Sequence, residues 1–204
     1  WHIPCIVVAD GCRDDTVSIV RRWIVQLGAS CTVMECSERS VGAARSLGTA
    51  LVVTDAARRG ITPDRLWLAH TDGDTSVTPD WLTQQLDIAV HGVDAVAGIV
   101  QLDESAPTSL VRRFRSHYSV DSDGTHTHVH GANIAMRAST YLDAGGWDTR
   151  RTGEDHDLWR RLRIVGHCVS STAIVVRTSP RTLGRAPNGF AADLRALGGS
   201  GVVA

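Results

Sequence analysis

The sequence predicts an α/β protein in which a mostly parallel sheet is flanked by helices. Short β-rich runs at 3–9, 30–36, 65–70 and 93–102 alternate with helical stretches, and this rhythm is typical of parallel sheets covered by helices. Asp10 stands just after the run at 3–9, and Asp72 stands just after the run at 65–70. Ligands of such sheets bind outside the carboxyl ends of the strands, so we expect a site at that edge.

The predicted elements of the first half are strands at 3–9, 30–36, 65–70 and 93–102, with helices at 14–28, 41–60 and from Thr78 to about His91. The strands are short and rich in β-branched residues, and turn residues bound them. Asp14 or Asp15 can cap the first helix and Gly28 can end it. The third helix has Thr78 as its expected cap and Pro79 at its first position.

The second half is less regular at its start. From 103 to about 130 the pattern loosens, and we interpret this stretch as an excursion over the sheet rather than as a second domain. The remaining predicted elements are a strand or turn at 131–137, a short helix up to Gly145-Gly146, a helix at 154–166, a strand at 167–178 and a closing helix at 189–199.

Composition narrows the functional classes. The length of 204 residues suits one domain with a sizeable core. The net charge of −1 gives no basis for a nucleic acid or an anionic membrane as partner. No apolar run approaches the roughly 18 residues of a spanning helix, so we expect no transmembrane segment, and we expect no signal peptide. Five cysteines without CxxC spacing disfavour a disulfide framework and favour the reducing cytoplasm.

The segment Asp72-Gly73-Asp74 directly follows the strand predicted at 65–70. Two carboxylates this close repel each other unless a positive charge lies between them. Mg²⁺ and Mn²⁺ prefer oxygen ligands and usually bind one or two carboxylates plus substrate phosphates. We expect the glycine to let both side chains face one cleft. Taken alone, such a segment is more often a polar turn, so the metal site depends on its context.

Glu154 and Asp155 stand at the start of the helix predicted at 154–166, with Asp157 close behind. An acid at this position is favoured by the helix dipole and by free backbone N–H groups. Capping needs only one acid, however, and three crowd into four positions. A carboxylate in a cleft can act as a general base toward a hydroxyl nucleophile.

His126, His128 and His130 alternate along the chain, so on a strand they would share one face. Three imidazoles on one face can bind zinc. A polar rim or a strand that contacts substrate is the favoured interpretation.

Together these residues resemble a known family. The segments IVVADGCRDDT, RSVGAARSLG, LAHTDGDTSVTPDWL, HGANIAMRASTYLDAGGW and GEDHDLWRRL are similar to successive landmarks of family-2 glycosyltransferases of the GT-A fold, in the family's order. They span residues 3 to about 165, and the tail is similar to bacterial members. The resemblance implies a Rossmann-like sheet in a single domain over 1–204. Residues 1–102 would form its nucleotide-sugar half and residues 103–204 its acceptor half.

The resemblance implies an inverting glycosyltransferase of the hexosyltransferase type (EC 2.4). It would move a sugar from a nucleoside-diphosphate sugar to an acceptor hydroxyl with Mn²⁺ or Mg²⁺ as cofactor. On the donor side, Asp10 would contact the nucleotide base and Arg45 would lie near the nucleotide. Asp74 would be the direct metal ligand, and Asp72 would lie nearer the ribose and the metal shell.

On the acceptor side, the resemblance implies that Asp155 is the catalytic base and that Glu154 orients it or the acceptor. His130, Gly131 and Asn133 would line the acceptor side. The expected protein is cytoplasmic, has no nucleic-acid partner and no transmembrane segment, and is compatible with a homodimer.

Two departures from the family remain. The usual first strand, of the type VSVVIPAYNE, is absent before 3–9, so we expect an N-terminally truncated domain with an unpaired slot in its sheet unless another segment fills it. The family often uses a late histidine as a further metal ligand, for which His130 and His167 are the candidates. The alternatives are a catalytically silent nucleotide-sugar-binding remnant, a nucleotidyltransferase and a histidine metal-binding protein.

Overall fold

The computed structural model describes residues 3–28, 30–150, 152–184, 186 and 189–199. Its strands are β1 (Cys5–Asp10), β2 (Cys31–Cys36), β3 (Trp67–His70), β4 (Thr75–Val77), β5 (Ala95–Leu102), β6 (Ile134–Arg137) and β7 (Cys168–Thr178). Its α-helices are α1 (Thr16–Leu27), α2 (Val41–Arg58), α3 (Trp81–Ala89), α4 (Thr108–Ser116), α5 (Ala138–Asp143), α6 (Glu154–Val165) and α7 (Phe190–Gly199), and two short 3₁₀ turns are η1 (Pro63–Arg65) and η2 (Gly131–Asn133).

The strands form two sheets. β1 and β2 make a parallel pair, and the other five lie in the order β3-β6-β5-β7-β4. Within the larger sheet only β5 and β7 run parallel, while β3 and β6, β5 and β6, and β4 and β7 are antiparallel. The expected α/β fold is confirmed, but the sheet is mixed rather than mostly parallel.

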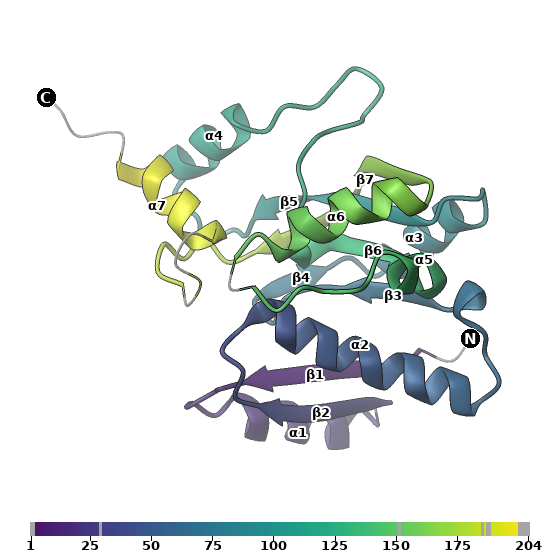
Figure 1. The fold of residues 1–204 in the computed structure, drawn as a ribbon. Helices are drawn as coiled ribbons and strands as arrows, with labels where there is room; N and C mark the ends of the chain where they lie inside the picture. The colour runs from purple at the N-terminus through teal and green to yellow at the C-terminus, as the bar shows by residue number, and fades with distance from the viewer. Residues whose placement is uncertain (1–2, 29, 151, 185, 187–188, 200–204) are drawn as a thin grey trace, which may run out of the picture.

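Helix α2 connects the two sheets. It packs on β1 and also contacts α6, and it lies between the two sheets in the view of Figure 1. A Cβ placed on Gly48 would meet the Val8 side chain at 3.0 Å, so the glycine at this position allows α2 to pack closely on β1. Among the residues that the structure describes, no strand pairing joins β1 to β3.

Apolar side chains are buried on both faces of the larger sheet. Leu158 and Leu162 of α6 are fully buried and pack with Met136 of β6 in one cluster. Trp81 of α3 packs with Val96 and other sheet residues in a second cluster. The first cluster also contains Leu68 of β3, so it fixes α6 and β3 relative to each other. Glu154 and Asp155 begin α6, and Asp72 follows the end of β3.

Two elements lie outside the predicted set. β4 is only three residues long, and it pairs with the end of β7, which lies about a hundred residues later in the sequence. α4 lies inside the stretch interpreted as an excursion, where Leu110 and Phe114 pack against Leu194 of α7. α4 and α7 lie side by side in Figure 1. In addition, α3 begins at Trp81 rather than at Thr78, because residues 78–81 form a turn before the helix.

Within the described ranges, no helix combines the length and the apolar character that crossing a bilayer requires.

Candidate active site

Arg45 lies at the centre of an acidic cluster. Its Nη2 is 2.5 Å from Asp72 Oδ1, just after β3, and its Nη1 is 2.6 Å from Glu154 Oε1, at the start of α6. The side chains of Arg45 and Glu154 are only 10% and 8% exposed, whereas that of Asp72 is 40% exposed. One guanidinium therefore joins an acid that the family resemblance places on the donor side to one that it places on the acceptor side.

The surroundings of Arg45 hold its charge in place. Burial alone would lower the pKa of Arg45, but the carboxylates of Asp72 and Glu154 outweigh it, so the pKa is raised. The Arg45 guanidinium also lies over the Trp147 ring, 5.1 Å from its centroid, which is a favourable cation–π distance. Burial raises the pKa of Glu154, and Arg45 partly offsets this rise.

Gly131 allows the guanidinium to lie against the main chain. A Cβ at position 131 would overlap the Arg45 guanidinium, although the backbone of Gly131 is not left-handed. The Gly131 N–H donates to Asp155 Oδ2 at 2.8 Å. Gly131 therefore contacts both the buried arginine and the predicted base.

We expect Gly131→Ala to lower the free energy of unfolding by about 1–3 kcal/mol, because an inserted methyl group would have to displace the buried guanidinium. Urea denaturation measures this change. Gly73→Ala is the matched control, since no atom of the described residues lies within 4 Å of a Cβ at Gly73. Equal stability of the two variants would contradict the close packing of Arg45 on Gly131.

Asp155 is oriented by two backbone groups. Its Oδ2 accepts from Gly131 N–H, and its Oδ1 accepts from His156 N–H at 2.9 Å. The N-cap of α6 is Gly153, and no side chain in the described part of the chain caps the helix. The three acids therefore have separate partners: Glu154 binds Arg45, Asp155 binds the main chain, and Asp157 forms ion pairs with Arg150, Arg160 and Arg161.

Asp72 and Asp74 flank a turn closed by Thr75 N–H donating to Asp72 O at 3.1 Å. Gly73 has no left-handed backbone, so the turn does not depend on glycine for its conformation. Asp74 Oδ2 is 2.8 Å from Arg181 Nη2, and the Asp74 side chain is 29% exposed. Each carboxylate of the pair is thus neutralised by an arginine.

The two carboxylates of Asp72 and Asp74 can supply part of the ligand shell of a hard divalent cation, but not all of it. The described residues contain no group of three or more His, Cys, Asp or Glu side chains that could hold a metal ion without further ligands. Mg²⁺ and Mn²⁺ commonly take one or two carboxylates and complete their shell with water and substrate phosphates. Asp72 and Asp74 have suitable oxygen atoms and partial exposure for this kind of site.

Asp10 lies at the end of β1 and binds the start of α2. Its Oδ1 accepts from Arg39 N–H at 2.8 Å and its Oδ2 from Ser40 N–H at 2.9 Å. The Ser40 hydroxyl donates to Thr149 O at 2.7 Å. Asp10 therefore helps to connect the smaller sheet to the loop before α6, and its contact with a nucleotide base stays a prediction.

His130 belongs to a stack of rings. Its Nε2 lies 2.5 Å from the Tyr118 hydroxyl, which also accepts from Val100 N–H at 3.1 Å. The Tyr118 ring stacks on His128 with centroids 3.9 Å apart, and His128 and His130 are parallel at 6.4 Å. His126 is 8% exposed, and both of its ring nitrogens are buried without a hydrogen-bond partner in the described residues. The side chains thus stack instead of converging on a metal ion.

The buried histidines predict an acid-sensitive fold. Burial lowers the pKa of His70 to about 3 and that of His130 to about 4, both below the ordinary value of 6.5. The unfolded chain therefore takes up protons first, and stability is lost as the pH falls from about 6.5 toward 4. Each such histidine contributes about 1.4 kcal/mol per pH unit inside this window.

Urea denaturation between pH 7 and pH 4.5 measures this dependence. His130→Phe keeps an aromatic ring in the stack and should reduce the slope, whereas His91→Gln, at an exposed position, should leave it unchanged. A slope that is the same in both variants would contradict the role of His130.

Asn133 and His167 do not line an open site. Asn133 is 1% exposed, and its side chain accepts from Trp81 Nε1 and donates to Ile99 O and Ile174 O. Asn133 therefore uses its side chain in the core, and its place on the acceptor side stays a prediction. His167 precedes β7 at the end opposite to Thr178, roughly 30 Å from the Asp74 turn along the strand, so it is wrongly placed for a further metal ligand.

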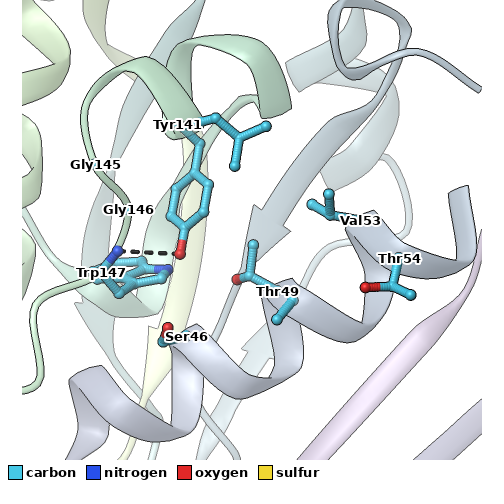
Figure 2. A pocket seen from close by; sticks show the side chains of 10 residues that line it. Ser46, Thr49, Val53, Thr54, Tyr141, Gly145, Gly146 and Trp147 are labelled. Atoms are coloured by element: carbon cyan, nitrogen blue, oxygen red, sulfur yellow. Dashed lines mark hydrogen bonds between the residues drawn. The ribbon is translucent and has the colours of Figure 1, made fainter. Parts of the chain in front are cut away.

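A cavity of about 410 Å³ lies between α2 and the segment that runs from α5 to Trp147; Figure 2 shows the residues that line it. Ser46, Thr49, Val53 and Thr54 line it from α2, and Trp147 and Tyr141 face them. The Tyr141 hydroxyl accepts from Trp147 N–H at 3.1 Å. Trp147 is shared with the Arg45 contact, but the acids of the cluster do not line this cavity, so we do not place the reaction there.

Three contributors were not identified from the sequence. Trp147 stands inside the quoted AGGW landmark, which could have drawn attention to it. Tyr118 is part of the stretch read as an excursion. Arg181 follows Pro180 in the tail. No local pattern indicates that it contacts the site, because its partner Asp74 is far away along the chain.

Comparisons with known proteins identify a family and a fold. The model of the family described as "Glycosyltransferase like family 2" matches residues 3–190. A mannosyltransferase, PcManGT from Pyrobaculum calidifontis, solved with GDP-Man and Mn²⁺, superposes with a TM-score of 0.58 at 20% identity, covering 89% of this chain and 49% of that one. TarS 1–349 from S. aureus, solved with UDP, gives a TM-score of 0.56 at 10% identity, covering 86% and 51%.

These two likenesses show a shared GT-A fold, and the chain spans about half the length of each solved structure. A search of curated protein sequences found no match.

Proposed function

The chain belongs to the glycosyltransferase like family 2, and from this membership we propose that it moves a sugar from a nucleoside-diphosphate sugar to an acceptor hydroxyl, with inversion at the anomeric carbon. The observation that carries the proposal is the Arg45 bridge, which brings Asp72 beside β3 together with Glu154 and its neighbour Asp155 on α6. The ligands in the titles of the two solved structures, GDP-Man with Mn²⁺ and UDP, support a nucleotide-linked donor.

On the donor side, Asp74 and Asp72 would hold Mn²⁺ or Mg²⁺. When bound, such a cation would neutralise charge on the departing diphosphate. Asp10, at the end of β1, is proposed to contact the nucleotide base. Arg45 is too enclosed for a main role in nucleotide contact, since its guanidinium is bound to Asp72 and Glu154 and covered by Trp147. We assign it the role of positioning both acids.

On the acceptor side, Asp155 would take the proton from the attacking hydroxyl. The acceptor oxygen forms a bond to the anomeric carbon, the bond from that carbon to the diphosphate oxygen breaks, and its electron pair leaves with the nucleoside diphosphate. The backbone N–H groups of Gly131 and His156 keep the carboxylate in one orientation for this step. A base that is held in place in this way needs little reorganisation before it accepts the proton.

The test is a thermal-shift panel of UDP- and GDP-linked sugars with and without Mn²⁺, followed by an assay for release of nucleoside diphosphate. We expect a donor to raise the Tm only when Mn²⁺ is present, and Asp74→Asn to abolish this effect. Release of nucleoside diphosphate separates an enzyme from a silent sugar-nucleotide binder. No stabilisation by any donor would overturn the proposal.

A further inference from the structure

The segment after β7 crosses the Asp72-Gly73-Asp74 turn. Thr178, at the end of β7, pairs with Thr75, and their hydroxyl oxygens are 2.9 Å apart. The next residue, Ser179, donates its N–H to Asp74 O at 3.2 Å. Main-chain contacts therefore hold the tail beside the predicted metal ligand.

Arg181 extends from this tail to the carboxylate of Asp74. The distance from its Nη2 to Asp74 Oδ2 is 2.8 Å, and the Arg181 side chain is 60% exposed. Arg45 differs in this respect, because its side chain is 10% exposed and is fixed by two carboxylates. Of these two arginines, Arg181 has the freedom to exchange its partner.

A cation on Asp74 would change the electrostatics of this pair. The Asp74–Arg181 contact is favourable while the carboxylate is negative, but a bound divalent cation leaves a net positive charge next to the guanidinium. Arg181 would then be repelled from the metal site. A diphosphate bound to the same cation offers oxygen atoms to the planar guanidinium, which can bind them with two parallel hydrogen bonds.

We propose that Arg181 is a donor-binding residue that exchanges partners, from Asp74 in the free protein to the donor diphosphate when the cation occupies Asp74. This inference rests on the proposed function. It assigns Arg181 two opposite effects, since it competes with the cation before the donor binds and assists the donor afterwards.

The opposite effects give the test. We measure Mn²⁺ binding by electron paramagnetic resonance without nucleotide, and UDP and GDP binding by calorimetry at saturating Mn²⁺. Arg181→Gln should bind Mn²⁺ about two- to fivefold more tightly, as expected for loss of an exposed ion pair. It should bind the nucleoside diphosphate about tenfold more weakly, as expected for loss of a charged hydrogen bond.

Arg177→Gln is the matched control. Arg177 lies on β7, is 56% exposed and pairs with Glu104 at 3.2 Å, so its loss should change neither constant. If Arg181→Gln weakens both ligands, Arg181 only holds Asp74 in position and the proposal is overturned. Unchanged affinities in Arg181→Gln also overturn it while leaving the proposed function intact. Failure of the wild-type protein to bind Mn²⁺ and both nucleotides overturns the proposed function and this inference together.

Discussion

Replacing Arg45 with methionine is expected to lower the free energy of unfolding by about 3–5 kcal/mol, because removal of one member of a buried ion pair leaves the other charge uncompensated. Glu154, at 8% side-chain exposure, is the group left without its partner. The loss should be smaller at low pH, since a buried and unpaired carboxyl has a raised pKa and becomes neutral by taking up a proton. Urea denaturation of variant and wild type at pH 5.5 and pH 8 measures both effects.

Two further variants make this prediction specific. Arg59, at the end of α2, is an exposed arginine that pairs with Asp55. Arg59→Ala should lower the free energy of unfolding by no more than about 0.5 kcal/mol. The double variant Arg45→Met with Glu154→Gln should recover part of the stability, because the buried charge is gone. A double variant no more stable than Arg45→Met alone would show that the loss comes from packing on Trp147 and not from charge.

Asp155→Asn is expected to lower kcat for sugar transfer by about 10²- to 10⁴-fold, which is the usual contribution of a positioned general base. Asparagine has nearly the same shape and can still accept one of the two backbone hydrogen bonds, so donor binding should be retained. Transfer kinetics give kcat, and calorimetry gives the donor affinity. Asp143→Asn, at an exposed position at the end of α5, is the control and should transfer at the wild-type rate.

The outcome separates the proposed roles on the two sides of the site. A normal kcat in Asp155→Asn would remove Asp155 as the base. Loss of donor binding together with kcat would instead place Asp155 on the donor side, against the arrangement proposed here.

Sequence reasoning worked best where a local pattern coincides with local burial. The strand predicted at 93–102 contains β5, and the helix predicted at 154–166 contains α6, because each apolar pattern faces its own layer of the core. It failed where the partner is distant. The helix α4 depends on Leu194 of α7, and the fixing of Asp74 depends on Arg181.

Asn133 shows a different limit. The family resemblance implies that Asn133 lines the acceptor side, which stays a prediction, and its buried position is connected with an irregularity in the sheet. The register between β5 and β7 shifts after Gly98, and Asn133 donates to Ile99 O and Ile174 O at that shift. Buried carbonyl groups outside a regular ladder need other donors. The identity of one polar residue does not reveal whether its side chain will bind main-chain groups or a ligand.

The division of the strands into two sheets has a consequence for cooperativity. Asp10 stands on the smaller sheet and Asp72 on the loop after β3 of the larger one, so a donor that contacts both would span the seam between two units joined by helix packing. A ligand that binds only when the two units are joined stabilises the joined form. In return, any contact that keeps the units joined strengthens the binding of that ligand. The donor would thus act as a structural cross-link as well as a reactant.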